Sequence, residues 1–149
     1  YNLMHILRIS NNAIRNSCSI SINALNEHGI NTNTIAYPFG TNIYKYKTIC
    51  SNYYKYGLST ERTYIDQAQI YDSMSLQRVF INTYNLSDYK SLIDQTVKCN
   101  GMLIFSVHSN TDEWSQEILN QIFKYLDCNN IKFMTFSEAI KYKTSKTQL

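Results

Sequence analysis

The residue best placed to do chemistry is His108, which directly follows the nearly continuous apolar run Met102-Leu-Ile-Phe-Ser-Val107. Such a run is typical of a strand buried on both faces of a parallel sheet. Ligands of parallel α/β folds bind at the C-terminal ends of the strands, so a histidine there is well placed as a general acid or base. The residues alone leave a second interpretation open, a histidine that only caps the strand or the next helix.

Two further segments carry chemically useful groups. The segment Ala36-Tyr-Pro-Phe-Gly40 predicts a tight turn that can present a backbone N–H, such as that of Phe39, to an oxyanion. Arg78 precedes the apolar segment Val79-Phe-Ile81, and an arginine in this position can hold a carboxylate through two hydrogen bonds. The alternatives are an ordinary strand-to-helix turn and a surface arginine.

The remaining histidines and the cysteines give weaker signals. His28 falls in the last turn of a predicted helix, where it complements the helix dipole, so we expect a structural role. His5 precedes that helix and is either a metal ligand or without function. The four cysteines have no C-x-x-C spacing, so we expect reduced, structural thiols and no zinc cluster. They are Cys18, Cys50, Cys99 and Cys128.

The elements that must position these residues alternate between helix and strand. The first half predicts a helix from Ser10, its N-cap, to Glu27, with Gly29 as a left-handed end. A strand at 34–38, a helix at 43–54, a strand at 56–60 and a loop at 61–75 follow.

The second half continues the alternation. It predicts a helix capped by Ser87 and ended by Asn100-Gly101, the strand at 102–107, a helix from Trp114 to Leu126, a strand at 131–134, and the capping box Thr135-Phe-Ser-Glu138 before a final helix. Alternating helices and short strands predict an α/β fold with a mostly parallel sheet, and residues 1–149 are predicted to form a single domain.

Composition excludes several classes of protein. With 149 residues, 44% of them hydrophobic, the chain can build the core of one domain. Lys+Arg 14 against Asp+Glu 11 gives a net charge of +3 without a concentrated basic face, which argues against nucleic acid as a partner. No apolar run approaches the roughly 18–20 residues of a membrane span. The chain starts at Tyr1 without a signal-peptide pattern, so we expect it to be processed or cut from a longer protein.

An ordered set of motifs resembles the C-terminal half of polysaccharide deacetylases, the NodB-homology domain of carbohydrate esterase family four. The resemblance implies part of a distorted (β/α) barrel, and it implies a hydrolase that removes acetyl groups from N-acetylated sugars with a divalent metal, usually zinc. The matching segments are Ala36–Gly40, Leu76-Gln-Arg78, Leu92-Ile-Asp94, Met102–Ser109 and Phe133–Ile140.

The resemblance also implies roles for individual residues. The N–H of Phe39 would help to hold the oxyanion, and His108 would protonate the leaving amine. The arginine that is usual in the turn motif is Ala36 here, and we expect Arg78 to supply that charge from another loop. The residues expected to bind substrate are Tyr37, Pro38 and Trp114.

The metal motifs of the family are incomplete in this chain. The Thr-Phe-Asp-Asp strand is absent, and His5 matches only the second histidine of H-x-x-x-H, because Tyr1 stands four residues before it. A single histidine cannot hold zinc, which needs about three protein ligands. We therefore expect a fragment that is inactive alone, with the metal bound in the full-length parent. The alternative is a catalytically inactive domain that binds carbohydrate or has a structural role.

The resemblance further implies the partners and the location. The expected partner is a polysaccharide or oligosaccharide, with association with the missing N-terminal half or with further copies as a second expectation. An extracellular or cell-envelope location follows from the resemblance alone. An unrelated α/β hydrolase or a structural domain is a third interpretation of the residues.

Overall fold

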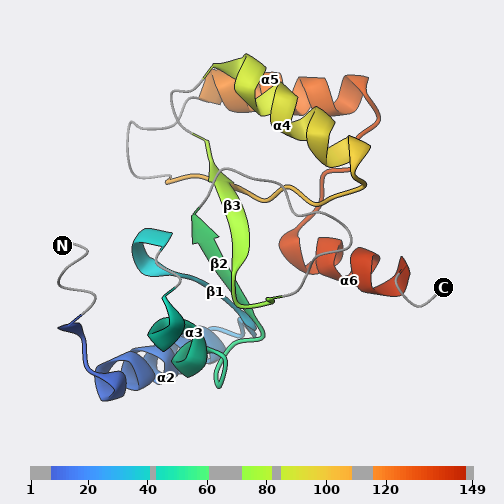
Figure 1. Ribbon diagram of the computed structural model, residues 1–149. Helices are drawn as coiled ribbons and strands as arrows, with labels where there is room; N and C mark the ends of the chain where they lie inside the picture. Colours follow the sequence, from blue (N-terminus) through green and yellow to red (C-terminus); the bar gives the residue numbers. More distant parts are fainter. Residues whose placement is uncertain (1–7, 41–42, 61–71, 82–84, 109–115, 147–149) are drawn as a thin grey trace. The chain divides into compact units, whose positions relative to one another are not determined.

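The computed structural model describes residues 8–40, 43–60, 72–81, 85–108 and 116–146 (Figure 1). The chain divides into two compact units, where the sequence predicts a single domain. The N-terminal unit comprises Tyr1–Glu61 and Tyr71–Gln77, and the C-terminal unit comprises Arg62–Ile70 and Arg78–Leu149. Each unit is described by itself below.

The N-terminal unit contains strands β1 (Thr34–Ala36) and β2 (Tyr56–Thr60), the start of strand β3 (Leu76–Phe80), and helices. Strands β1 and β2 pair in parallel, with Thr34 opposite Tyr56. The strand order in this unit is β1-β2-β3. The elements are α2 (Asn11–Glu27), β1 (Thr34–Ala36), the short 3-10 helix η1 (Pro38–Gly40), α3 (Tyr44–Cys50), β2 (Tyr56–Thr60) and the start of β3 (Leu76–Phe80).

Helix α2 begins and ends where local signals in the sequence predict. The Oγ of Ser10 accepts a hydrogen bond from the Ala13 amide at 3.2 Å, which satisfies one of the free N–H groups of the first turn. Gly29 follows with φ of 73°, the left-handed conformation that glycine adopts without strain. Ile14 and Cys18 are the buried residues of this helix. The cap predictions are confirmed.

Helix α3 is shorter than the predicted helix at 43–54. It ends at Cys50, whose carbonyl accepts hydrogen bonds from the amides of both Tyr53 and Tyr54 at 2.9 Å. The side chain of Asn52 also turns back to the Thr48 carbonyl at 2.9 Å, so side-chain and turn bonds replace the next helical turn. The core of the unit consists of Ile14, Cys18, Tyr37, Tyr46, Ile49, Cys50, Tyr54 and Met74.

The C-terminal unit has a second parallel strand pair and three helices. Strands β3 and β4 pair with Val79 opposite Phe105. The elements, after the rest of β3, are α4 (Leu86–Lys98), β4 (Phe105–Ser106), α5 (Gln116–Cys128) and α6 (Phe136–Lys146). The α/β class and the parallel pairing of strands are therefore confirmed. No helix in the described part of the chain has both the length and the apolar character that crossing a membrane requires.

The prediction that Ser87 caps a helix is wrong. Helix α4 begins at Leu86 after the N-cap residue Asn85, so Ser87 lies inside the first turn. The earlier start lets Leu86 pack against the core of the C-terminal unit, which favours it over the side-chain cap. The helix ends as predicted near Asn100, which has a positive φ of 51°.

In this unit the predicted strand at 102–107 is shorter than expected, and the predicted strand at 131–134 is absent. Of residues 102–107 only Phe105–Ser106 form β4, and Val107 is 41% exposed. Residues 131–134 have no strand, and Ile131 instead donates its amide to the Leu126 carbonyl at 2.9 Å, at the end of α5. The capping box at the start of α6 is confirmed, since Glu138 accepts hydrogen bonds from both the amide and the hydroxyl of Thr135.

Candidate functional site

The strands of the C-terminal unit place two of the predicted catalytic residues on one sheet face. Val79 and Ile81 are buried in the core that β3 shares with α4 and α5. Side chains alternate along a strand, so Arg78 and Phe80 lie on the opposite face. Phe80 stands opposite Ser106, and His108 follows two residues later. Arg78 and His108 therefore share the sheet face that points away from these helices.

The ring of His108 lies against the ring of Phe80. The imidazole and the ring of Phe80 have their centroids 4.6 Å apart with an interplanar angle of 51°. His108 itself is exposed, at the C-terminal end of β4. The Phe80 ring thus supports one side of the imidazole while solvent can reach the other. This arrangement is suitable for proton transfer to a bound molecule.

Arg78 is a half-buried cation on the same face. Burial lowers the pKa of its guanidinium, because removal from water disfavours the charged form. Arginine nevertheless stays protonated in proteins, so the sheet carries a fixed positive charge two residues before Phe80. Such a group is suited to orient an anionic or polar part of a ligand.

The turn in the N-terminal unit has an unusual backbone. Phe39 has φ of 55° and Gly40 has φ of 69°, both in the left-handed region. A bulky residue pays a steric penalty there, so its neighbours must hold the conformation. The Gly40 amide donates to the Tyr37 carbonyl at 3.0 Å, and Pro38 has no N–H. The Gly40 amide is thus used within the turn, and Pro38 has no amide to donate. The Phe39 amide takes no part in this hydrogen bond.

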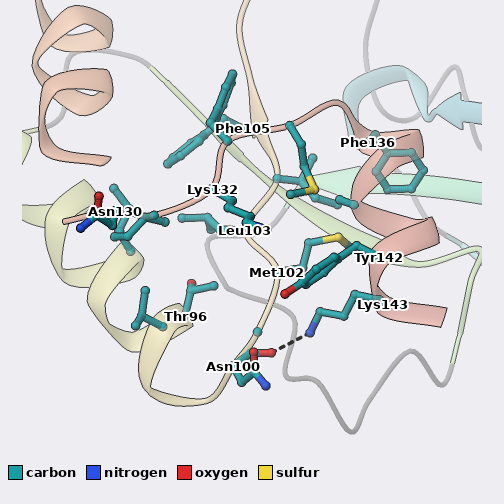
Figure 2. Close-up of a pocket in the computed structure, with 18 residues that line it drawn as sticks. Thr96, Asn100, Met102, Leu103, Phe105, Asn130, Lys132, Phe136, Tyr142 and Lys143 are labelled. Carbon is teal, nitrogen blue, oxygen red and sulfur yellow. Dashed lines mark hydrogen bonds between the residues drawn. The ribbon is translucent and has the colours of Figure 1, made fainter. Parts of the chain in front are cut away.

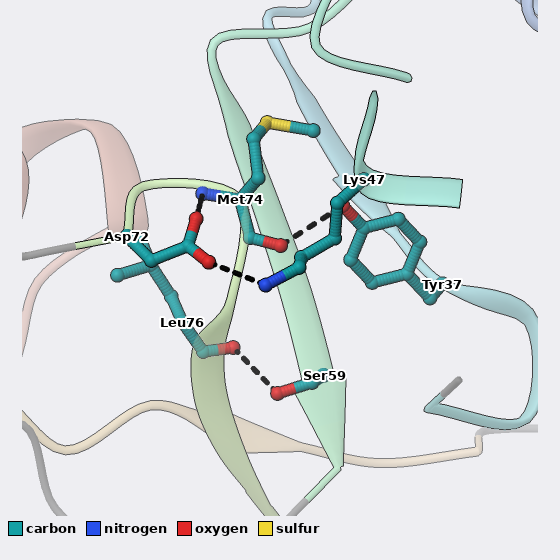
Figure 3. Close-up of polar contacts among 6 residues, drawn as sticks. All are labelled: Tyr37, Lys47, Ser59, Asp72, Met74 and Leu76. Atoms are coloured by element: carbon teal, nitrogen blue, oxygen red, sulfur yellow. Dashed lines mark hydrogen bonds and ion pairs between the residues drawn. The ribbon is translucent and has the colours of Figure 1, made fainter. Parts of the chain in front are cut away.

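The side chain of Tyr37 supports the turn from the core of the unit. Its side chain is 1% exposed, and its hydroxyl donates to the Met74 carbonyl at 2.9 Å (Figure 3). Burial raises the pKa of this phenol, so it stays a donor. A Cβ at Gly57 would lie 2.4 Å from the same hydroxyl, so the ring passes over a position where only glycine fits. Tyr37, predicted to bind substrate, has its side chain in the core.

Met74, whose carbonyl accepts the hydrogen bond from Tyr37, is itself held by Asp72, which forms an ion pair with Lys47. Asp72 accepts the Met74 amide at 2.9 Å and binds Lys47 Nζ at 2.6 Å (Figure 3). Ser59, which is buried on β2, donates to the Leu76 carbonyl at 3.4 Å. Sequence reasoning missed this network, because Asp72 and Met74 fall in a segment without periodicity that predicts only a loop.

The described residues do not fit a zinc site. Among them no group of three or more His, Cys, Asp or Glu side chains is arranged to hold a metal ion. His5, the predicted ligand, and Trp114, a predicted substrate residue, lie outside the described residues.

The described residues of each unit also line a pocket of ligand size. In the N-terminal unit a pocket of about 510 Å³ is lined by α2, β1 and the turn, including Pro38 and Phe39. In the C-terminal unit a pocket of about 530 Å³ lies between α4, α6 and the residues that lead into β4 (Figure 2). At its edge Lys143 Nζ donates to the Asn100 carbonyl at 2.7 Å, and Lys132 lies over the Tyr142 ring. Neither pocket has a signal in the sequence, because its lining residues come from segments that are distant along the chain.

Comparison with known proteins gives no relative. No protein-family model, characterised protein or solved structure matches this chain. The functional argument therefore depends on the residues of the chain itself.

Proposed function

We propose that this chain is the C-terminal portion of a polysaccharide deacetylase, a hydrolase that removes acetyl groups from N-acetylated sugars. The observation that carries the proposal is the shared sheet face of Arg78 and His108, with an exposed imidazole at the C-terminal end of a parallel strand. That end of the strand is where parallel α/β enzymes place their catalytic groups. The motif resemblance supplies the reaction class.

Each residue has one role in the proposal. His108 donates a proton to the amine nitrogen as the amide C–N bond breaks, which turns a poor leaving group into a neutral amine. Arg78 supplies the positive charge that orients the sugar substrate.

The proposal assigns no metal step to the described residues. The resemblance implies a divalent metal, with zinc as the first candidate, but the described residues do not provide three ligands. Activation of the attacking water is therefore left to groups outside them. The described residues of the C-terminal unit contribute proton donation and charge.

The test compares two histidine substitutions in the longest protein that contains this chain. Acetate release from an oligomer of N-acetylglucosamine is measured for His108→Gln, with zinc supplied. His28→Gln is the matched control, since His28 is exposed at the C-terminal end of α2. We expect His108→Gln to lower kcat/KM by about 10²–10⁴, the usual contribution of a general acid, and the control to have no effect. Equal activity of both variants would refute the role.

A second candidate function is carbohydrate binding without catalysis. Phe39 and Tyr44 are 66% and 81% exposed, and both belong to the region of the turn and the start of α3. Exposed aromatic rings of this kind can stack on sugars through their apolar faces. If this function holds, the wild-type protein binds the oligomer in the presence of a chelator, and it releases no acetate under any condition.

A further inference from the structure

Two cysteines that are distant in the sequence meet in the core of the N-terminal unit. Cys18 on α2 and Cys50 at the end of α3 are 4% and 1% exposed, and their Sγ atoms are 3.8 Å apart. The two helices pack against each other (Figure 1). A disulfide needs an S–S distance of about 2.05 Å, so a small movement of the two side chains would bring the sulfurs into bonding range.

The pair is also reachable from a cavity. Both cysteines line the pocket of about 510 Å³ in this unit, beside the hydroxyl groups of Ser17 and Ser21. The same pocket extends to Pro38 at the turn. A small reagent that enters this pocket therefore meets both thiols, although each is almost fully shielded from bulk water.

We propose that Cys18 and Cys50 are a redox pair that closes to a disulfide when a small-molecule disulfide of the glutathione class enters this pocket. One protein sulfur, as its thiolate, attacks the reagent, breaks its S–S bond and releases one thiol, which leaves a mixed disulfide. The second protein thiolate then attacks the protein sulfur of that mixed disulfide and releases the second thiol. The protein loses two hydrogen atoms, and the reagent gains two electrons and two protons.

The surroundings of the pair make this reaction slow at neutral pH. Burial raises the pKa of Cys18 and, together with the charge of Cys18, raises that of Cys50 to about 12. The titratable groups that share this core are Tyr37, Tyr46 and Tyr54, whose pKa values are also raised, so they stay neutral. Because only the thiolate reacts, we expect the closing rate to rise about tenfold per pH unit between pH 7 and 9.

Oxidation would change the pocket as well as the core. The new bond would tie α2 to α3 across the wall of the pocket that Cys18 and Cys50 line. The other two cysteines differ in setting, because Cys99 is half-buried and Cys128 is exposed. The inference is independent of the proposed deacetylase function.

The test uses the whole chain with Cys99→Ser and Cys128→Ser, which leaves only the pair. The folded protein is incubated with oxidised glutathione at pH 7, 8 and 9, free thiols are then blocked, and the products are analysed by mass spectrometry. We expect the loss of two hydrogens, a peptide that joins Cys18 to Cys50, a higher Tm, and reversal by dithiothreitol.

A matched control and two contrary results make the test decisive. With Cys18→Ala added, we expect only a glutathione adduct on Cys50 and no rise in Tm. The proposal is overturned if the pair keeps both free thiols at pH 9 while the protein is folded. It is also overturned if the reaction stops at the glutathione adduct when both cysteines are present.

Discussion

The turn of the N-terminal unit and the strand end of the C-terminal unit hold their functional groups in different ways. The turn presents a backbone amide, and its shape depends on buried contacts, above all the hydrogen bond from Tyr37 to the Met74 carbonyl. The strand end presents the side chain of His108, which is exposed and lies against Phe80. A substitution cannot remove a backbone amide, but it can remove the side chains that hold the turn in shape. We therefore expect substitutions around the turn to lower stability and substitution of His108 to lower activity.

A large effect on stability is expected at Gly57. In Gly57→Ala the new Cβ would lie 2.4 Å from the Tyr37 hydroxyl and 2.8 Å from the Met74 carbonyl oxygen. Neither atom can move without breaking the hydrogen bond between them, so we expect a loss of about 3 kcal/mol, the upper part of the overpacking range.

Gly29→Ala is the matched control for this substitution. A Cβ there meets nothing within 4 Å, and its only penalty is the positive φ of 73°. We expect a cost of about 1 kcal/mol. Urea unfolding of both variants measures the difference, and equal losses would contradict the account of the turn.

Tyr37→Phe removes the hydroxyl and keeps the ring. The buried Met74 carbonyl then loses this donor, so we expect a loss of about 2 kcal/mol, within the range for an unsatisfied buried group. The loss should also depend on pH. The raised pKa of Tyr37 means that the folded state holds the phenol proton more tightly, so its contribution is present below the ordinary tyrosine pKa of about 10 and is lost above it.

Unfolding experiments at pH 8 and at pH values above 10 check this expectation. The wild type should lose stability as the pH rises through this range, and Tyr37→Phe should lose less. A difference between the two proteins that stays constant with pH would mean that the phenol is not the group responsible.

Phe80→Leu tests how much the ring of Phe80 contributes to positioning His108 at the strand end. Leucine keeps an apolar side chain at a half-buried position, so we expect a stability loss of about 1 kcal/mol. The ring contact that positions His108 is lost, and acetate release should fall about tenfold in kcat with little change in KM. Phe133→Leu, at a 62% exposed position in the same unit, is the control and should leave the rate unchanged.

The smallest effect is expected at the start of α6, away from both regions. Hydrogen bonds from Thr135 lower the pKa of Glu138, so its contribution is present above the ordinary glutamate pKa and is lost as the pH falls through the lowered value. Glu138→Gln should lower Tm by no more than a few degrees at pH 7. The difference should vanish in acid, and a difference that persists at pH 2 would contradict the role of the charge.

Local signals in the sequence predict some elements well. Ser10 and Gly29 mark the limits of α2, and the capping box from Thr135 to Glu138 marks the start of α6, because these motifs act within a few residues of the chain. Strands depend on partners, so the apolar segment 131–134 predicts a strand that the structure does not contain. Ser87 fails as a cap because packing of Leu86 on the core, a tertiary effect, decides where α4 begins.

The candidate site was predictable only in its separate parts. The position of His108 after an apolar run is visible in the sequence, as is the Pro-Phe-Gly turn. The contact between His108 and Phe80 joins residues far apart in the chain, and so does the approach of Cys18 to Cys50. The positive φ of Phe39 also has no sequence signal, because the left-handed region is unusual for phenylalanine.

The most direct test of the account measures acetate release and Tm side by side for His108→Gln, in the longest protein that contains this chain. Because His108 is exposed, we predict that kcat/KM falls by about 10²–10⁴ while Tm stays within a degree or two of the wild type. A wild-type rate, or a rate loss explained by an equal loss of folded protein, would contradict the assignment of His108 as the proton donor.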